Sequence, residues 1–309
     1  MSNYAYFQGK FVPLADAKIG VMTHAFNYGT GCFEGIRGYW NEAAGQLYVF
    51  RLREHYERLA RSARILGFKF PASVDELCET TLELVRRNET RADVYIRPLL
   101  FKSSEVVGVR MHNLEDGFTI FTAPMGKYID AAAGARCRIS SWRRVDDNAI
   151  PARAKVTGIY INSALAKTEA QADGYDEAIM LTHDGHVSEG SGENIFLVAD
   201  GALLTPSPSD NILMGITRSS VIQIARDDLG VVTVERSVDR SELFTADECF
   251  MTGTAAEITP VIEVDRRAIG TGAIGPITHR LQECFIDAVR GNNPKYQQWC
   301  APVYGSVRG

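Results

Sequence analysis

Apolar residues recur at helical spacing in two segments of the first third of the chain. The first segment predicts a helix over 53–66 that stops at Gly67. The residues that share its apolar face are Leu52, Tyr56, Leu59, Ala63 and Leu66. In the second segment, Ser73 and Glu76 have the Ser-x-x-Glu spacing of a capping box, which predicts a helix from Ser73 to about Asn88.

Alternating apolar and polar residues predict the strands of the same region. The chain opens with a hairpin whose strands, 4–7 and 10–12, flank a Gln-Gly turn. Further strands are expected at 35–39, 46–52, 94–101 and 117–124. This mixture of helices and strands favours a small N-terminal α+β domain over 1–125.

Residues 126–135 are rich in small side chains and are interpreted as an interdomain linker. The remainder, 136–309, is predicted to form a larger C-terminal α/β domain in which Asp-Gly turns mark hairpins. Its strands are expected at 136–142, 177–182, 194–199, 202–205, 231–237, 249–252 and 258–264. Its helices are expected at 158–172, 217–228 and 276–289, the last with an apolar face of Ile277, Leu281, Cys284, Phe285 and Ala288.

Length and composition fit an ordinary globular protein of two domains, with 309 residues, 45% of them hydrophobic and 23% charged. The net charge of −5 argues against nucleic-acid and anionic-membrane partners. No segment approaches the roughly 20 apolar residues of a membrane span, and the first residues lack the features of a signal peptide. Six scattered cysteines without a CxxC motif favour reduced thiols in the cytoplasm. No metal site is expected, because the pair His183 and His186 has no third ligand nearby.

Lys155 is the first candidate for chemistry. It stands among small residues (Pro151, Ala152, Ala154 and Gly158), and a lysine in such surroundings can form an imine with a carbonyl cofactor. Tyr160 follows at a spacing that suits a hydrogen bond to a cofactor oxygen. A partly buried core tyrosine would have the same spacing, so this assignment stays open on the sequence alone.

A glycine-rich segment, Val187–Asn194, carries two acidic candidates, Glu189 and Glu193. A carboxylate on such a turn can lie against a pyridinium nitrogen. The segment is interpreted as a loop between two strands, for which solvated carboxylates are the simpler alternative. It matches no dinucleotide fingerprint, because the strand–turn–helix context is missing.

Two turns are candidates for binding an anion. At Gly215-Ile216-Thr217 a loop enters a helix, where unpaired N–H groups and the helix dipole favour negative charge. Thr217 could instead simply cap that helix. Gly253–Glu257 is interpreted as a tight turn whose N–H groups face a cavity. Arg58 could supply the charge that a phosphate requires, although its spacing alone favours an i,i+4 pair with Glu54.

Strand alternation places Tyr95 and Arg97 on one face of their strand. A tyrosine beside an arginine suits a substrate carboxylate, and a surface cation pair is the alternative.

Taken together, these segments carry a family signature. The chain resembles the branched-chain amino-acid aminotransferases, which are pyridoxal-phosphate enzymes of fold type IV. The matching runs, in the family's order, are His24–Thr30, Phe33–Arg37, Tyr95–Pro98, Ala154–Lys155 with Tyr160, Ser188–Asn194, Gly215–Arg218 and Gly253–Pro260. The resemblance implies a two-domain α+β architecture of the D-amino-acid aminotransferase-like type. It also implies pyridoxal 5′-phosphate as the cofactor.

The resemblance further implies a role for each matching residue. Lys155 would hold the cofactor covalently, Glu189 would keep its pyridine nitrogen protonated, and Tyr160 would bind the ring hydroxyl oxygen. The remaining cofactor contacts would come from Arg58, Asn194, Gly215, Ile216, Thr217, Gly253 and Thr254. The substrate pocket would consist of Tyr28, Phe33, Arg37, Tyr95, Arg97, Val109, Met125, Tyr128, Ala255 and Ala256. Family members often have Trp-Gly-x-Tyr where this chain has Met125–Tyr128, which predicts a looser pocket wall.

The expected reaction is amino transfer from leucine, isoleucine or valine to 2-oxoglutarate. The family works as homodimers or larger homo-oligomers, and the loop matching 102–110 would reach the neighbouring subunit's site. Three rivals share the fold type: a D-amino-acid transaminase, an (R)-amine transaminase and an aminodeoxychorismate lyase. A scaffold protein without a cofactor is a further alternative, against which Lys155 and Glu189 argue.

Overall fold

The computed structural model describes residues 3–126 and 133–305. Within them the chain forms two compact units. Unit 1 combines Met1–Gly126, Ala154–Gly158 and Asp287–Gly309, and unit 2 combines Lys127–Arg153 and Ile159–Ile286. Most of the expected linker, 127–132, lies outside the described residues. The domain limits expected from the sequence remain a prediction.

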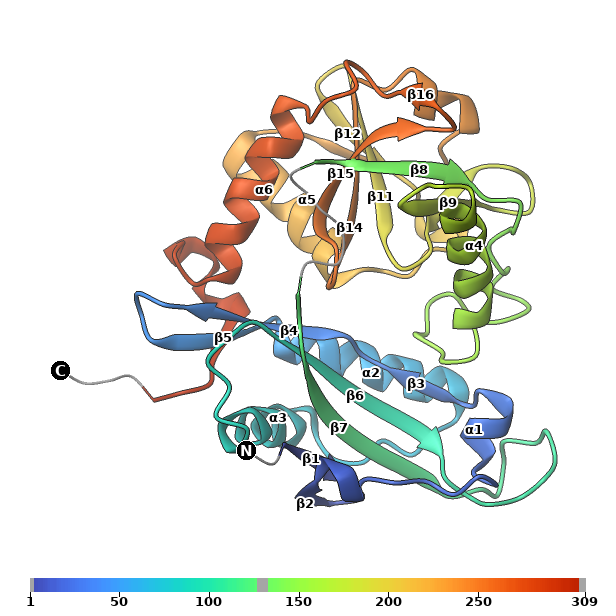
Figure 1. Ribbon diagram of the computed structural model, residues 1–309, viewed down its shortest axis with the longest axis vertical. Helices are drawn as coiled ribbons and strands as arrows, with labels where there is room; N and C mark the ends of the chain where they lie inside the picture. The colour runs from blue at the N-terminus through green and yellow to red at the C-terminus, as the bar shows by residue number, and fades with distance from the viewer. Residues whose placement is uncertain (1–2, 127–132, 306–309) are drawn as a thin grey trace. The chain divides into compact units, whose positions relative to one another are not determined.

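Unit 1 is built on a sheet in the order β17-β5-β4-β6-β7-β1-β2, with β3 paired to β6 (Figure 1). Its strands are β1 (Tyr4–Phe7), β2 (Lys10–Pro13), β3 (Gly31–Phe33), β4 (Ile36–Asn41), β5 (Gln46–Phe50), β6 (Val94–Lys102), β7 (Asp116–Pro124) and β17 (Cys300–Pro302). Its helices are η1 (Leu14–Asp16), α1 (His24–Tyr28), α2 (Leu52–Leu66), α3 (Val74–Arg87) and η4 (Pro294–Trp299).

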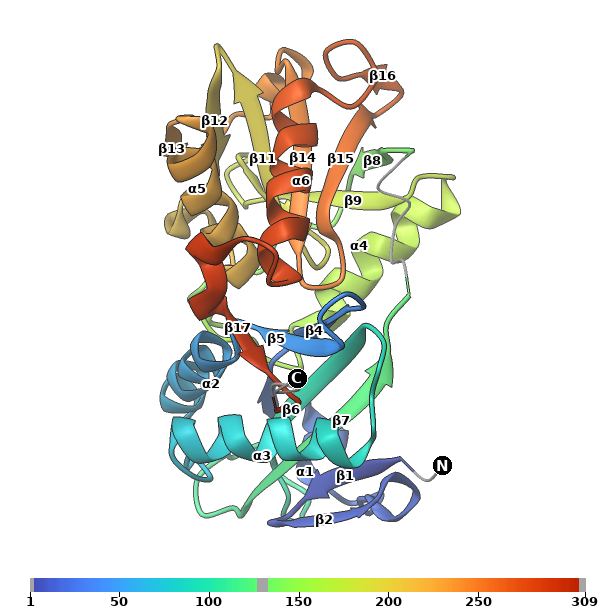
Figure 2. The same ribbon diagram turned by 90° about the vertical axis from the view of Figure 1, so that its left-hand side faces the viewer.

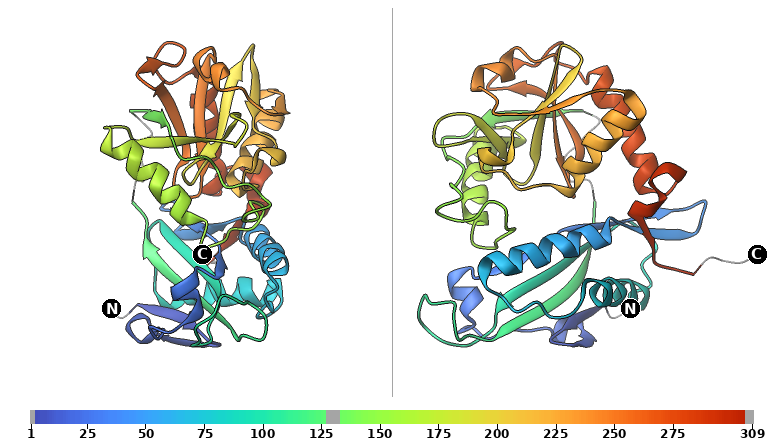
Figure 3. Two further views of the ribbon diagram at one scale, coloured as in Figure 1. Left: turned by 90° about the vertical axis from the view of Figure 1, so that its right-hand side faces the viewer. Right: turned by 180° about the vertical axis from the view of Figure 1, so that it is seen from behind.

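The core of unit 1 lies where α2 and α3 cover one face of this sheet (Figure 3). The predicted apolar stripe of α2 supplies Tyr56 and Leu59, both fully buried. The capping box of α3 is confirmed, since Ser73 Oγ accepts from Glu76 N at 3.2 Å and Glu76 Oε2 accepts from Ser73 N at 2.8 Å. The predicted N-terminal hairpin is confirmed as well, with Gln8 and Gly9 at positive φ in its turn.

Unit 2 is built on a second sheet, in the order β10-β9-β8-β15-β14-β11-β12-β13, with β16 paired to β15 (Figure 2). Its strands are β8 (Ala135–Ile139), β9 (Glu177–Leu181), β10 (Val187–Gly190), β11 (Asn194–Ala199), β12 (Ala202–Thr205), β13 (Thr233–Glu235), β14 (Glu248–Gly253), β15 (Glu257–Val264) and β16 (Arg267–Ala268). Its helices are α4 (Tyr160–Ala172), η2 (Pro208–Asp210), α5 (Ile216–Leu229), η3 (Arg240–Phe244) and α6 (Pro276–Val289), whose last residues belong to unit 1.

Helices cover both faces of the unit 2 sheet. α4 lies along β8 and β9, while α5 and α6 lie on the other face, next to β14 (Figures 1 and 2). The apolar face predicted for α6 buries Leu281, Phe285 and Ala288. Glu248 of β14 fixes the start of α6, because its carboxylate accepts from the backbone N of Ile277 (3.0 Å) and of Thr278 (2.7 Å). Among the described residues, no helix is both long and apolar enough to cross a membrane.

Candidate active site

Lys155 lies in the short segment Ala154–Gly158, which belongs to unit 1. Its backbone N donates to Ser62 Oγ at 3.2 Å, and its backbone O accepts from Phe33 N at 3.0 Å. Its Nζ lies 5.1 Å from the centre of the Phe33 ring. The backbone at Lys155 is therefore held between α2 and β3, so the origin of its side chain is fixed.

Glycines allow this segment to lie flat against α1 and β3. Gly158 N donates to Gly29 O at 3.1 Å, and a Cβ added to Gly29 would lie 2.8 Å from Gly158 Cα. Gly29 also has a positive φ of 65°, which a larger residue rarely adopts. The small residues around Lys155 thus allow two backbones to approach closely.

Tyr95 and Arg97 lie side by side on β6, as strand alternation predicted. Arg97 donates to Tyr95 Oη from Nε at 2.9 Å and from Nη2 at 2.6 Å. The Arg97 guanidinium carbon lies 4.2 Å from the centre of the Phe33 ring, the same ring that Lys155 approaches. Unit 1 therefore brings together Lys155, Phe33, Tyr95 and Arg97.

The other predicted substrate residues of unit 1 lie in three different settings. Arg37 Nη2 is 3.3 Å from Asp93 Oδ2, and its guanidinium lies 4.9 Å from the Tyr39 ring centre. Tyr28 Oη accepts from Gly108 N at 3.0 Å, which ties the 102–110 loop to α1, and Val109 beside it is 82% exposed. Met125 directly follows β7. Tyr128 lies outside the described residues.

Arg58 is buried on α2 and binds a glutamate that the sequence analysis did not single out. Its Nε lies 2.8 Å from Glu34 Oε1 and its Nη2 lies 2.7 Å from Glu34 Oε2. Glu54, the partner considered from spacing alone, pairs instead with Arg51 Nε at 2.8 Å. Helical spacing made the Glu54 pair plausible, but the buried carboxylate of Glu34 offers Arg58 a bidentate bond.

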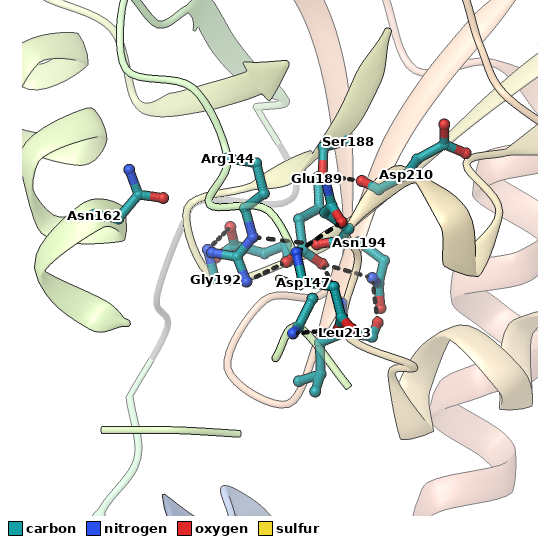
Figure 4. Close-up of polar contacts among 12 residues, drawn as sticks. Arg144, Asp147, Asn162, Ser188, Glu189, Gly192, Asn194, Asp210 and Leu213 are labelled. Atoms are coloured by element: carbon teal, nitrogen blue, oxygen red, sulfur yellow. Dashed lines mark hydrogen bonds and ion pairs between the residues drawn. The ribbon is translucent and has the colours of Figure 1, made fainter. Parts of the chain in front are cut away.

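Glu189 lies on strand β10 rather than on the loop that its glycine-rich surroundings predicted. β10 pairs with β9, and Glu189 stands opposite Met180. Arg144 Nη2 lies 2.8 Å from Glu189 Oε1, while Asn194 Nδ2 (3.0 Å) and Leu213 N (3.1 Å) donate to Oε2 (Figure 4). The carboxylate is buried and bonded to Arg144, Asn194 and the Leu213 N–H, so the alternative of a solvated loop acid is wrong.

Sequence reasoning missed Arg144, which follows β8 and has no motif around it. Its own position is fixed, because its backbone N donates to Leu181 O at 2.8 Å and its Nε donates to Asn211 O at 3.4 Å. Only strand pairing brings it to Glu189, so the sequence offered no local signal.

Glu193 is buried as deeply as Glu189 but has a different environment. Burial, reinforced by the charge of Glu177, raises the pKa of Glu193 to about 8. Lys167 pairs with Glu177, and Glu193 Oε2 accepts from Gly192 N at 3.0 Å. Near neutral pH Glu193 is therefore protonated, whereas Glu189 has an arginine as its partner. Of the two candidates, Glu189 is the one whose carboxylate is paired with an arginine.

The two predicted anion-binding turns both occur in unit 2. α5 begins at Ile216, with Gly215 in the N-cap position, and within the described chain no side chain caps it. Thr217 is the second helical residue, so its alternative role as the cap is wrong. The tight turn predicted at Gly253–Glu257 is present between β14 and β15, and Thr259 Oγ1 donates to Ala256 O at 2.7 Å.

Close contacts join these turns to the Glu189 region. A Cβ added to Gly215 would lie 2.1 Å from Asn194 Oδ1, and one added to Gly253 would lie 3.4 Å from Gly192 O. Unit 2 therefore brings together Glu189, Asn194, the start of α5 and the Gly253 turn. Tyr160, the first residue of α4, also belongs to this unit and is half-buried.

The family description Amino-transferase class IV matches residues 31–264. A curated relative, the probable branched-chain-amino-acid aminotransferase of Aquifex aeolicus, is 52% identical over 98% of this chain and 97% of its own length. The crystal structure of the branched-chain aminotransferase of Thermoproteus uzoniensis with norvaline has a TM-score of 0.94 at 47% identity, covering 98% of this chain and all of that one. The enzyme of Thermobaculum terrenum in its PLP form gives a TM-score of 0.94 at 38% identity, covering 98% and 99%.

The chain belongs to the class IV aminotransferases. The predicted resemblance to branched-chain aminotransferases is confirmed by the relatives' names and by their coverage of nearly the whole chain. The predicted α+β fold of type IV is confirmed by the same structures.

Proposed function

We infer that this enzyme transfers the amino group of leucine, isoleucine or valine to 2-oxoglutarate, giving a branched 2-oxo acid and L-glutamate. The observation that carries this inference is the similarity to branched-chain aminotransferases over 98% of the chain. The curated relatives with this name include bacterial enzymes at 42–52% identity.

Pyridoxal 5′-phosphate is the cofactor, and the described residues fit its chemistry. A buried carboxylate with an arginine partner, Glu189, suits a protonated pyridine nitrogen. The N-terminus of α5, which no described side chain caps, suits a phosphate because its N–H groups and dipole both attract an anion. When bound, the cofactor supplies a conjugated system that accepts the electron pair of the substrate's Cα–H bond.

We propose that Lys155 holds the cofactor covalently and then moves the proton. With cofactor and substrate bound, Lys155 Nζ would take the proton from the substrate Cα and would later return it. A general base positioned in this way contributes about 10²–10⁴-fold to the rate. The backbone bonds from Lys155 to Ser62 and Phe33 keep this proton carrier in place through both half-reactions.

The other cofactor contacts are part of the same proposal. Glu189 keeps the pyridine nitrogen protonated, and Asn194 holds the Glu189 carboxylate in position. Tyr160 binds the ring hydroxyl oxygen. The phosphate is bound by Arg58 and by residues of the two turns, namely Gly215, Ile216, Thr217, Gly253 and Thr254.

We propose that substrate side chains are sorted by the cluster around Phe33. Arg97, fixed by Tyr95, receives the acidic chain of glutamate, and the Phe33 ring receives the branched apolar chain. The remaining pocket residues of this proposal are Tyr28, Arg37, Val109, Met125, Tyr128, Ala255 and Ala256.

We also propose a homodimer or larger homo-oligomer, in which the 102–110 loop reaches the neighbouring subunit's site. Support comes from exposed apolar side chains on unit 1: Ile19, Val21, Met22, Phe26, Val107 and Val109. Two of them, Ile19 and Phe26, line an apolar cavity of about 350 Å³ together with Phe7, Leu14 and Phe121. A cytoplasmic location is proposed as well, because all six cysteines carry thiols.

The inference is tested by hydride trapping and a panel of half-reactions. Borohydride should fix the cofactor to the peptide that contains Lys155, and Lys155→Ala should abolish both the adduct and turnover. Absorbance changes should be fast with L-leucine, L-valine and L-glutamate and slow with D-alanine and an (R)-amine. Arg97→Leu should slow the glutamate half-reaction more than the leucine one. An adduct on another peptide, or an equal loss for both substrates, would contradict these assignments.

A further inference from the structure

Glu34 and His55 have no part in the roles assigned so far, yet both are fully buried beside Arg58. Glu34 Oε2 lies 2.7 Å from His55 Nδ1 and 2.7 Å from Arg58 Nη2, and its Oε1 lies 2.8 Å from Arg58 Nε. The exposed fraction is 0% for Glu34, 2% for His55 and 4% for Arg58. In the interior of unit 1, the Glu34 carboxylate therefore bonds both the imidazole of His55 and the guanidinium of Arg58.

The geometry of α2 explains this arrangement. His55 and Arg58 are three residues apart, so their side chains lie on one face of the helix and reach the same point. Glu34 follows β3 and is fixed by its backbone N, which donates to Pro98 O at 2.9 Å. Glu34 is therefore fixed to the sheet, and its carboxylate determines the positions of the His55 and Arg58 side chains.

The charge states are unequal. Burial alone would raise the pKa of Glu34, but Arg58 and the hydrogen bond from His55 hold it at about 2. Burial lowers the pKa of His55, against the opposing effect of Glu34. Near neutral pH His55 is therefore neutral and donates its Nδ1–H to an ionised Glu34.

We propose that Glu34 and His55 are positioning residues for the cofactor's phosphate group, acting through Arg58. The bidentate bond from Nε and Nη2 fixes the plane of the guanidinium, so the direction of Nη1 is set before any phosphate arrives. His55 fixes the carboxylate in turn. This proposal rests on the proposed function, in which Arg58 binds that phosphate.

The bond pattern distinguishes positioning from simple charge neutralisation. A single point charge would lower the phosphate affinity of Arg58 by cancelling its charge. A fork that engages two nitrogens also removes the rotational freedom that Arg58 would otherwise lose on binding. If fixing of the guanidinium dominates, removal of the Glu34 charge weakens phosphate binding. If charge cancellation dominates, the same removal strengthens it.

The test compares two ligands of the apoenzyme: pyridoxal 5′-phosphate, and pyridoxal, which lacks the phosphate. Dissociation constants are measured by quenching of tryptophan fluorescence. Glu34→Gln, whose amide cannot accept at both atoms, should weaken binding of the phosphorylated ligand by about 10- to 100-fold. Pyridoxal binding should change little, because its contacts do not involve Arg58.

A matched pair at position 55 covers the case in which Glu34→Gln fails to fold. His55→Asn retains an N–H donor close to the place of Nδ1, and His55→Leu retains none. His55→Leu should lose severalfold in affinity for the phosphorylated ligand, and His55→Asn should recover most of it. A purely structural role would weaken binding of both ligands equally, and that result would overturn the proposal.

Arg58→Gln distinguishes a failure of the positioning role from a failure of the proposed phosphate role of Arg58. If Arg58→Gln leaves the preference for the phosphorylated ligand intact, the phosphate role of Arg58 itself is wrong. If Arg58→Gln abolishes the preference but Glu34→Gln and His55→Leu preserve it, only the positioning role is overturned. Tighter binding of pyridoxal 5′-phosphate by Glu34→Gln would also overturn it, in favour of charge neutralisation.

Discussion

Each unit of this protein buries a glutamate against an arginine, but the two pairs are arranged differently. In unit 1, Arg58 engages both oxygens of Glu34, and His55 donates to one of them as well. In unit 2, Arg144 engages one oxygen of Glu189, while Asn194 and the Leu213 N–H engage the other. In the first pair the glutamate positions an arginine, whereas in the second the arginine supports a glutamate.

Glu193 shows what burial does to a glutamate that has no arginine partner among the described contacts. It is as buried as Glu189, but the pKa of its carboxyl is raised to about 8, chiefly by that burial. Burial beside a second carboxylate therefore favours the neutral acid at Glu193, whereas the bonded arginine favours the anion at Glu34. The contrast suggests which group in each pair acts on the ligand, and substitutions can test it.

The largest effect is expected for Glu189→Gln. A neutral amide does not keep a pyridine nitrogen protonated, so kcat should fall by about 10²–10³-fold, the range for loss of one preorganised electrostatic contact. Stopped-flow absorbance of the leucine half-reaction measures this loss. Cofactor affinity should fall much less, since the phosphate contacts remain. Glu193→Gln is the matched control, and an equal loss in both variants would contradict the assignment to Glu189.

A smaller effect is expected for Arg144→Met. Glu189 would keep its bonds to Asn194 and Leu213 but lose its charge-assisted partner, so kcat should fall by about 10-fold. Arg144→Lys keeps the positive charge but loses the planar guanidinium, so its kcat should lie between that of Arg144→Met and that of the parent. Steady-state kinetics with leucine and 2-oxoglutarate decide the order. A rate unchanged in Arg144→Met would show that the backbone and amide donors suffice.

The last expected effect concerns stability and not rate: a pH-dependent change at Glu193. The pKa of Glu193 is about 8 in the folded protein against 4.5 for an ordinary glutamate. Below about pH 4.5 both the folded and unfolded chains hold the proton. As the pH rises from there to about 8, only the unfolded chain loses it, so the free energy of unfolding declines by up to ~1.4 kcal/mol per pH unit.

Glutamine does not titrate, so Glu193→Gln should gain stability relative to the parent across that interval. Urea unfolding at pH 5, 6.5 and 8 measures the difference. Thr182→Ser provides a control, since it lies in the same unit and changes no charge. A difference between variant and parent that stays constant with pH would mean that Glu193 is ionised in the folded protein.

Much of the fold could be predicted from periodicity, but the strand that carries Glu189 could not. α2, α3 and the long strands β6 and β7 have strong patterns of their own, and their predicted extents are confirmed within one or two residues. β10 consists of Val-Ser-Glu-Gly, a composition typical of loops. It becomes a strand because β9 offers it a pairing edge, which no local pattern reveals.

The candidate site shows the same division. Lys155, Glu189 and the two turns stand in motifs that the sequence displays directly. Arg144 lies far from Glu189 along the chain, and only the order of strands β10-β9-β8 brings them together. Glu34 lies within a recognised run, Phe33–Arg37, but the sequence does not show that it bonds Arg58. That contact depends on how α2 packs against the residue that follows β3.

The last strand has a consequence for how the protein is made. β17 pairs with β5, Arg51 N donates to Trp299 O at 2.6 Å, and Val303 is buried with Leu47. The ribosome must therefore synthesise all of Ile159–Ile286 before the first-made sheet receives its final edge strand. Until β17 has been made, β5 has an open edge, and such an edge is a template for pairing with another chain.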